Sequence, residues 1–153
     1  MSVSPGIDRE PIRDDDVLWR RVPFKNPRYV KPDQTLTSSS FTPRWKHGEK
    51  DLSVNVKRLS THEASIKDPE LYRLYSLKAE YVRSIDLCVC HDPCPNEEPA
   101  NAAHVLIRSC HDVQDDCLGE RMVDLKIAPP KITESYSRRM AQTAQLVRYL
   151  PEE

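Results

Sequence analysis

The sequence predicts an α+β domain in which a mixed, mainly antiparallel sheet carries one central helix and one C-terminal helix. Three observations lead to this class. Residues 52–56 alternate apolar and polar side chains strictly, which is typical of a half-buried strand. Apolar residues recur at helical spacing after Asp68 and again after Thr133. Short strand patterns lie before and between these two segments, so strands and helices are expected to share one core.

The domain boundaries follow from length and polarity. The chain has 153 residues, which predicts a single domain. Residues 1–16 are polar and show no periodicity, so they are expected to form a flexible N-terminal tail. Residues 17–150 are expected to form the single globular α+β domain.

The first strand is expected at residues 17–22, because this segment is rich in β-forming side chains and stops at Pro23. A second extended segment is expected at residues 35–41, closed by Pro43. The alternating residues 52–56 make the third strand.

The central helix is expected to begin after Asp68. Asp68 suits the N-cap, Pro69 suits the first helical position, and the helix is expected to run to about Ser84. The apolar side chains that fall on one face of this helix are Leu71, Leu74, Tyr75, Val82 and Ile85.

The C-terminal half is expected to hold a hairpin and a closing helix. Residues 86–91 and 102–107 read as strands, and the stretch between them is rich in proline and polar residues. A further strand is possible at residues 122–127 by its alternation. The closing helix is expected from about Thr133, with an apolar stripe of Tyr136, Met140, Ala144 and Val147.

Composition excludes several functions. The formal net charge is −1, which argues against a nucleic-acid partner. No apolar run is long enough to span a bilayer, so no membrane partner is expected. The N-terminus has no secretory pattern, which predicts a cytoplasmic protein with reduced thiols. Three glycines cannot build a dinucleotide fingerprint or a P-loop.

Cysteines and histidines gather between residues 88 and 117. If the predicted hairpin pairs Cys90 with His104, then Cys88, Cys90 and His104 share one face, and Cys94 in the loop could complete a zinc site. The competing interpretation is buried thiols, because the spacing lacks a second ligand pair. A Cys–His nucleophile is a further alternative. His104 could be a general base facing Arg20 or a hydrogen-bonded core residue.

Several phrases occur in an order and spacing that resemble a family of small, uncharacterised bacterial proteins. The resemblance implies no activity for this chain. The phrases that carry it are Leu18–Pro23 (LWRRVP), Ser38–Phe41 (SSSF), Leu52–Val56 (LSVNV), Val82–Ser84 (VRS), Asp92–Pro93 (DP) and Asn101–His104 (NAAH).

An arginine on a first strand followed by a serine-rich segment also resembles the opening of ADP-ribosyltransferases. The resemblance implies that Arg20 or Arg21 binds NAD and that Ser38 and Ser39 shape the pocket. It also requires a glutamate to stabilise an oxocarbenium ion, for which Glu120 is a candidate by its order in the chain. Glu134 is a second candidate on the same ground.

The favoured interpretation is a non-enzymatic protein-interaction or accessory module with no cofactor, because no catalytic set is complete. NAD or zinc would be the cofactor of the alternatives. Aromatic residues and arginine dominate binding energy at interfaces. The expected contact surface is therefore Trp19, Arg21, Phe41 and Trp45, with Arg20 beside them, although Trp19 and Phe41 could equally be core.

Overall fold

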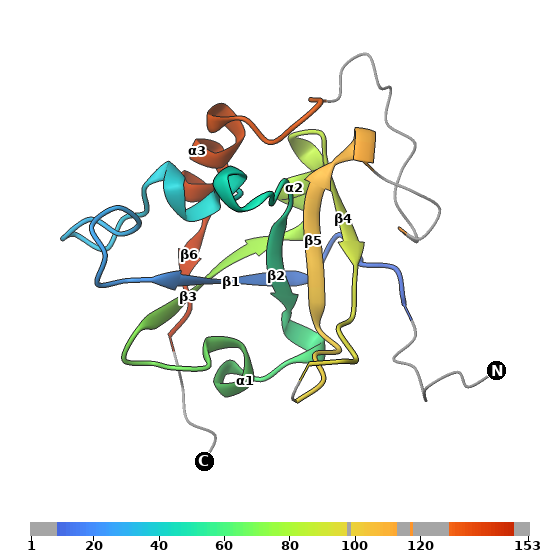
Figure 1. The fold of residues 1–153 in the computed structure, drawn as a ribbon, viewed down its shortest axis with the longest axis horizontal. Helices are drawn as coiled ribbons and strands as arrows, with labels where there is room; N and C mark the ends of the chain where they lie inside the picture. Colours follow the sequence, from blue (N-terminus) through green and yellow to red (C-terminus); the bar gives the residue numbers. More distant parts are fainter. Residues whose placement is uncertain (1–8, 98, 113–116, 118–128, 149–153) are drawn as a thin grey trace.

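The computed structural model describes residues 9–97, 99–112, 117 and 129–148. Within these residues the α+β class is confirmed: one six-stranded sheet is ordered β4-β5-β2-β1-β3-β6, and neighbouring strands all pair antiparallel (Figure 1). The strands are β1 (Val17–Pro23), β2 (Leu52–Val56), β3 (Tyr72–Lys78), β4 (Leu87–His91), β5 (His104–Ser109) and β6 (Gln145–Leu146). The α-helices are α1 (His62–Ile66), α2 (Ala79–Ser84) and α3 (Glu134–Thr143). Short 3₁₀ helices are η1 (Ser38–Phe41), η2 (Trp45–His47), η3 (Lys57–Leu59) and η4 (Cys110–Asp112).

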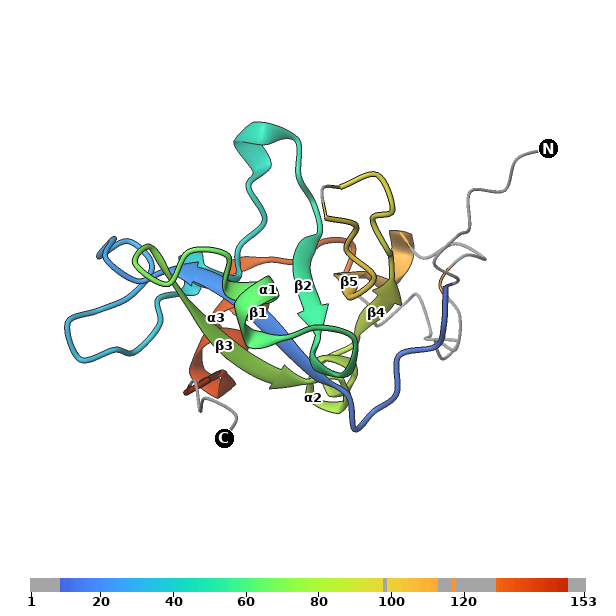
Figure 2. The ribbon, with the colours of Figure 1, turned by 90° about the horizontal axis from the view of Figure 1, so that it is seen from below.

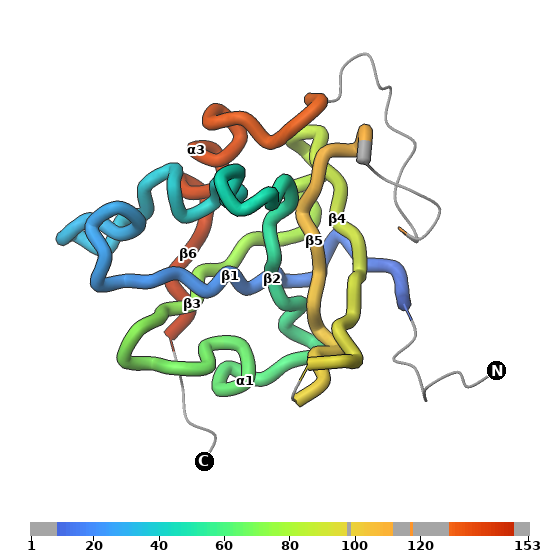
Figure 3. The backbone as a smooth tube through the Cα atoms, in the orientation of Figure 1, coloured from blue at the N-terminus to red at the C-terminus, as the bar shows by residue number. Residues whose placement is uncertain are grey.

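β1 pairs with β3 over a much longer stretch than with β2. It pairs with β3 along all seven residues, from Val17 to Pro23. It pairs with β2 only at Leu18 and Trp19, and in Figures 1 and 3 it crosses β2 instead of running beside it. The sheet therefore opens between β1 and β2 beyond Trp19.

The main core lies on one face of this sheet. Alternate residues of the strands, such as Leu18, Val54 and Ile107, point toward Phe41 of η1 and Met140 of α3. All of these side chains are at most 4% exposed. Removal of each such side chain from water stabilises the fold by about 1.5–3 kcal/mol.

The predicted central helix is wrong over its first half. Residues 72–78 form β3, and only residues 79–84 form a helix, α2. The carboxylate and carbonyl of Asp68 accept hydrogen bonds from the backbone of Glu70 and Leu71, which makes a turn in place of a helix cap. Seven-residue pairing with β1 satisfies this backbone and buries Leu74 and Leu77, so tertiary pairing outweighs helical periodicity.

The predicted strand at residues 35–41 is also wrong, because residues 38–41 form η1. Local hydrogen bonds favour the turn. The Ser40 hydroxyl donates to the Tyr29 carbonyl (2.6 Å), and the Thr42 hydroxyl donates to the Ser38 carbonyl (2.8 Å). Such side-chain bonds to backbone groups compete with strand pairing.

Residues 9–16, predicted as part of a flexible tail, pack on the domain. Ile12 is 2% exposed and belongs to the main core. The Asp16 carboxylate accepts from Arg58 Nε at 2.8 Å, and Glu10 N donates to Nδ1 of the buried His91 at 2.9 Å. The rest of the predicted tail, residues 1–8, lies outside the described residues.

Most of the other predicted elements are present in the structure. The strands at 17–22 and 52–56 and the hairpin of β4 and β5 are present. The closing helix begins after Thr133 as predicted, but it ends at Thr143, and the chain then pairs with β3 as β6. The possible strand at 122–127 lies outside the described residues. No helix in the described part of the chain has the length and apolar character needed to cross a bilayer.

Candidate functional site

A cavity of about 690 Å³ lies where β1 and β2 separate. We call it the basic groove. It is lined by β1, by the 42–49 segment and by β2, and it extends to Asn101 and His104. Figure 2 shows the 43–51 segment and the 92–103 segment rising on the same side of the sheet. The groove therefore results from the short β1–β2 pairing.

Arg20 bridges the gap between the separated strands. Its Nε donates to the Ser40 carbonyl and its Nη1 donates to the Ser53 carbonyl, both at 2.9 Å. Burial lowers the pKa of the guanidinium to about 10, with Arg21 and Arg44 acting in the same direction, so Arg20 stays charged at neutral pH. One side chain thus satisfies a backbone carbonyl of η1 and another of β2.

Positive charge dominates the basic groove. Among the described residues, two carboxylates line it, Glu49 and Glu97. Glu49 forms a two-pronged ion pair with Arg44 (2.8 and 3.2 Å), which lowers the pKa of the Glu49 carboxyl. The cationic side chains that line the groove are Arg20, Arg21, Arg28, Arg44, Lys46 and Lys67. An anionic ligand is the complementary class.

Aromatic side chains occupy both the wall and the rim of the groove. Trp19 is 8% exposed and packs with Ile66 and Leu74 beneath α1. Trp45 is 44% exposed. The Arg21 guanidinium lies 4.9 Å from the Tyr72 ring centroid, which orients its charge over an apolar face. Trp45 is therefore the aromatic side chain most open to a ligand.

The structure brings half of the predicted site residues to this one groove. Phe41 does not belong to a contact surface, because it is 0% exposed in the main core. Ser38 lines a different cavity, beside Tyr75, and Glu120 lies outside the described residues. Glu134 is exposed on the first turn of α3 and is not among the residues that line the groove. The predicted residues that line the groove are Trp19, Arg20, Arg21, Ser39, Trp45 and His104.

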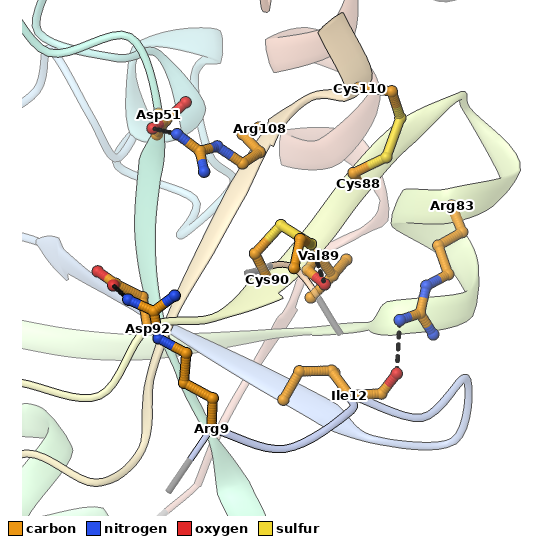
Figure 4. Close-up of a disulfide and its surroundings, with 11 residues drawn as sticks. Arg9, Ile12, Asp51, Arg83, Cys88, Val89, Cys90, Asp92, Arg108 and Cys110 are labelled. Carbon is orange, nitrogen blue, oxygen red and sulfur yellow. Dashed lines mark hydrogen bonds and ion pairs between the residues drawn. A yellow bond between two sulfur atoms is a disulfide. The ribbon is translucent and has the colours of Figure 1, made fainter. Parts of the chain in front are cut away.

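The predicted zinc set is wrong in two of its members. Cys88 is bonded to Cys110 and Cys90 to Cys117, with Cα–Cα distances of 5.3 and 4.9 Å, so neither offers a thiolate (Figure 4). The expectation of reduced thiols is wrong for these four cysteines. The hairpin register is two residues from the predicted one, because Cys90 pairs with Leu106. Cys88, Cys90 and His104 still share a face, since the difference is even.

A second cluster lies at the end of the hairpin. Asp92, Cys94 and His104 each place a potential ligand atom within 4.8 Å of the others. His104 Nδ1 lies 3.3 Å from Asp92 Oδ2 and 2.8 Å from the Asp92 carbonyl oxygen. All three side chains are partly buried. Two members of the predicted zinc set, Cys94 and His104, are thus close to each other.

The same cluster gives no support to a cysteine nucleophile. Burial raises the pKa of the Cys94 thiol, and the neighbouring Glu97 and Asp92 carboxylates raise it further. A thiol of this kind is mostly protonated at neutral pH and is a poor nucleophile.

Sequence reasoning missed Arg28, Arg44, Lys46 and Lys67 in the groove and Asp92 in the second cluster. The run Arg44–His47 is basic around a tryptophan, which is a visible signal. Lys67 gave no signal, because it reaches the groove through a positive φ of 61° after α1. Comparison with protein-family models, with curated proteins and with solved structures finds no match.

Proposed function

We propose that the protein is a non-enzymatic binding module whose basic groove receives an acidic segment of a partner protein. The observation that carries the proposal is the charge of the groove: among described residues, six cations face two carboxylates, one of them already paired with Arg44. The whole chain has a net charge of −1, so this local field comes from the fold. Clefts lined by one sign of charge attract ligands of the opposite sign.

The groove suits carboxylates better than a nucleic acid. Nucleic-acid grooves combine cations with several exposed aromatic stacking platforms and an overall basic domain. Here Trp45 is the one tryptophan exposed at the rim, while Trp19 is packed beneath α1. Arginine forks such as Arg21 and Arg28 match carboxylates in a two-pronged geometry.

The test is a titration with a glutamate-rich peptide as the probe and a glutamine-rich peptide of the same length as the control, followed by tryptophan fluorescence. We expect the glutamate-rich peptide to bind and the affinity to fall with added salt. Lys46→Glu should weaken binding about five-fold, or about 1 kcal/mol. Lys57→Glu, an exposed lysine of η3 that does not line the groove, is the matched control. Equal binding of both peptides, or equal loss in the two variants, would contradict the proposal.

An NAD-dependent transferase is the less favoured alternative. In its support, Arg20 and Ser39 line the groove together with Glu97. Against it, Arg20 is already bonded to two backbone carbonyls and the serine segment is the 3₁₀ helix η1, not a strand. The same titration with NAD⁺ as the probe, with a release assay for nicotinamide, tests this alternative.

The proposal also includes the cellular compartment in which the protein meets its partner. The sequence predicts the cytoplasm, where thiols stay reduced. Two disulfides in one hairpin region instead favour an oxidising compartment. We therefore infer that the module meets its partner where disulfides persist.

A further inference from the structure

Three backbone hydrogen bonds hold the segment that carries the Asp92, Cys94 and His104 cluster. Asp92 N donates to the His104 carbonyl at 2.9 Å, directly beyond the last pair of β4 and β5. Cys94 and Asn101 form an isolated antiparallel bridge, with N–O distances of 2.8 and 2.9 Å. The loop that carries Asp92 and Cys94 is therefore fixed against the start of β5, where His104 lies.

We propose that Asp92, Cys94 and His104 bind a zinc ion beside the basic groove, with one coordination position left open. The inference goes beyond the proposed binding function and does not depend on it. Of the three ligands, His104 lines the groove, as does Glu97, whose carboxylate lies near the Cys94 thiol. Three protein ligands with one open position are the arrangement of zinc sites that exchange a ligand.

The distances are close to those of a tetrahedral site. Nitrogen and oxygen ligands about 2.0–2.2 Å from zinc lie roughly 3.3–3.5 Å apart at the tetrahedral angle. His104 Nδ1 and Asp92 Oδ2 are already 3.3 Å apart. The Cys94 sulfur lies within 4.8 Å of a ligand atom of each of the other two residues, which exceeds by about 1.2 Å at most the ~3.6 Å edge that a Zn–S bond of about 2.3 Å requires. A change in the Cys94 side-chain rotamer provides a movement of this size.

The donor set selects the metal. One thiol, one imidazole and one carboxylate form a borderline set that suits zinc better than the hard cations magnesium and calcium, which prefer oxygen alone. Lys67 is a nearby cation that opposes metal binding, and the Asp92 and Glu97 carboxylates offset it.

The competing interpretation is a hydrogen-bond cluster around the Asp92 carbonyl. That oxygen lies 2.8 Å from His104 Nδ1 and 3.6 Å from Cys94 Sγ. Zinc would replace both contacts, which are worth about 1 kcal/mol each. This interpretation needs neither the Asp92 carboxylate nor a thiolate, so variants at those positions separate the two.

The experiment is a titration of the full chain, without reductant, with Co²⁺ as a spectroscopic probe and then with Zn²⁺ in competition with a chromophoric chelator. With the other four cysteines in disulfides, Cys94 is the one free thiol. A thiolate-to-Co²⁺ charge-transfer band therefore reports on Cys94 alone. We expect one equivalent of Co²⁺ to produce this band with the visible absorption of tetrahedral cobalt, and Zn²⁺ to abolish both.

Variants decide between the interpretations. Cys94→Ser should remove the charge-transfer band, and Asp92→Asn should weaken Zn²⁺ binding by more than the ~10–100-fold that the loss of an outer-shell partner costs. His111→Gln, an exposed histidine of η4 at the end of β5 opposite His104 and outside the groove lining, is the matched control and should bind as the wild type does. Absence of the band in the wild type, or unchanged Zn²⁺ affinity in Cys94→Ser and Asp92→Asn, would overturn the proposal. Neither result depends on whether the groove binds a peptide.

Discussion

Arg20 shows how a single residue can have a structural role that its sequence context does not reveal. Its position on the first strand, beside Arg21, suggested a ligand-binding arginine. The structure instead places its guanidinium between the Ser40 carbonyl of η1 and the Ser53 carbonyl of β2, in the part of β2 that does not pair with β1. Arg21, by contrast, is exposed and lies over Tyr72, so it is the arginine of the pair that is open to a ligand.

Replacement of Arg20 by lysine should therefore destabilise the fold. An ammonium group is a point donor and cannot span both carbonyls, whereas the planar guanidinium does. We expect Arg20→Lys to lower the free energy of unfolding by about 2 kcal/mol, from the loss of one charged hydrogen bond at a half-buried site. Urea denaturation followed by circular dichroism measures this change.

The matched control is Arg21→Lys, which should change the free energy of unfolding by less than about 0.5 kcal/mol, as is usual at exposed positions. Equal stability of Arg20→Lys and Arg21→Lys would show that the two carbonyl contacts contribute nothing.

At the scale of the elements, local sequence pattern and tertiary pairing disagree at β3. The strand at residues 52–56 was predictable because strict alternation of apolar and polar side chains indicates a half-buried strand. Residues 71–85 were not, because Leu71, Leu74 and Val82 satisfy a helical period while residues 72–78 are in fact paired with β1. The exposed state of Leu71, at 50%, shows that the helical stripe was partly coincidental.

Helix α3 contains a buried hydroxyl that offers a test at this scale. Ser137 is 0% exposed, and its Oγ has no hydrogen-bond partner among the described residues. A buried polar atom left unsatisfied costs about 1–3 kcal/mol. Alanine also has the higher helix propensity. We expect Ser137→Ala to raise the free energy of unfolding by about 1 kcal/mol.

Ser135→Ala is the matched control, because Ser135 is exposed on the same helix. It reports the helix propensity alone, so the difference between the two variants in urea denaturation isolates the buried hydroxyl. A stability gain no larger for Ser137→Ala than for Ser135→Ala would indicate that a bound water satisfies Ser137.

At the scale of the whole molecule, part of the groove lining was predictable from the sequence, but its excess of positive charge was not. Six candidate site residues from the sequence line one cavity: Trp19, Arg20, Arg21, Ser39, Trp45 and His104. The excess of positive charge was hidden by a net charge of −1, because the cations come from segments far apart in the sequence. The fold brings Arg28, Lys46 and Lys67 to one cavity beside the point where β1 and β2 separate.

The disulfides are the second whole-molecule feature that the spacing of the cysteines in the sequence did not predict. Cys88 and Cys90 were expected to be free, yet they tie β4 to Cys110 and Cys117, which are 22 and 27 residues later in the chain. Closing loops of this length stabilises a fold by about 3 kcal/mol each in the chain-entropy model. The two loops overlap, so their combined contribution is smaller than the sum.

A thiol count under denaturing conditions tests this arrangement directly. We expect the oxidised protein, unfolded in guanidinium chloride, to show one reactive thiol, that of Cys94, and to show five after reduction. Cys110→Ser with Cys88→Ser should lower the free energy of unfolding by about 3 kcal/mol. Cys94→Ser should leave it nearly unchanged in the absence of metal. Five reactive thiols in protein isolated from its host without added reductant would contradict both disulfides. That result would also contradict the oxidising compartment inferred from them, because cysteines that stay reduced in the cell match the cytoplasmic location that the sequence predicts.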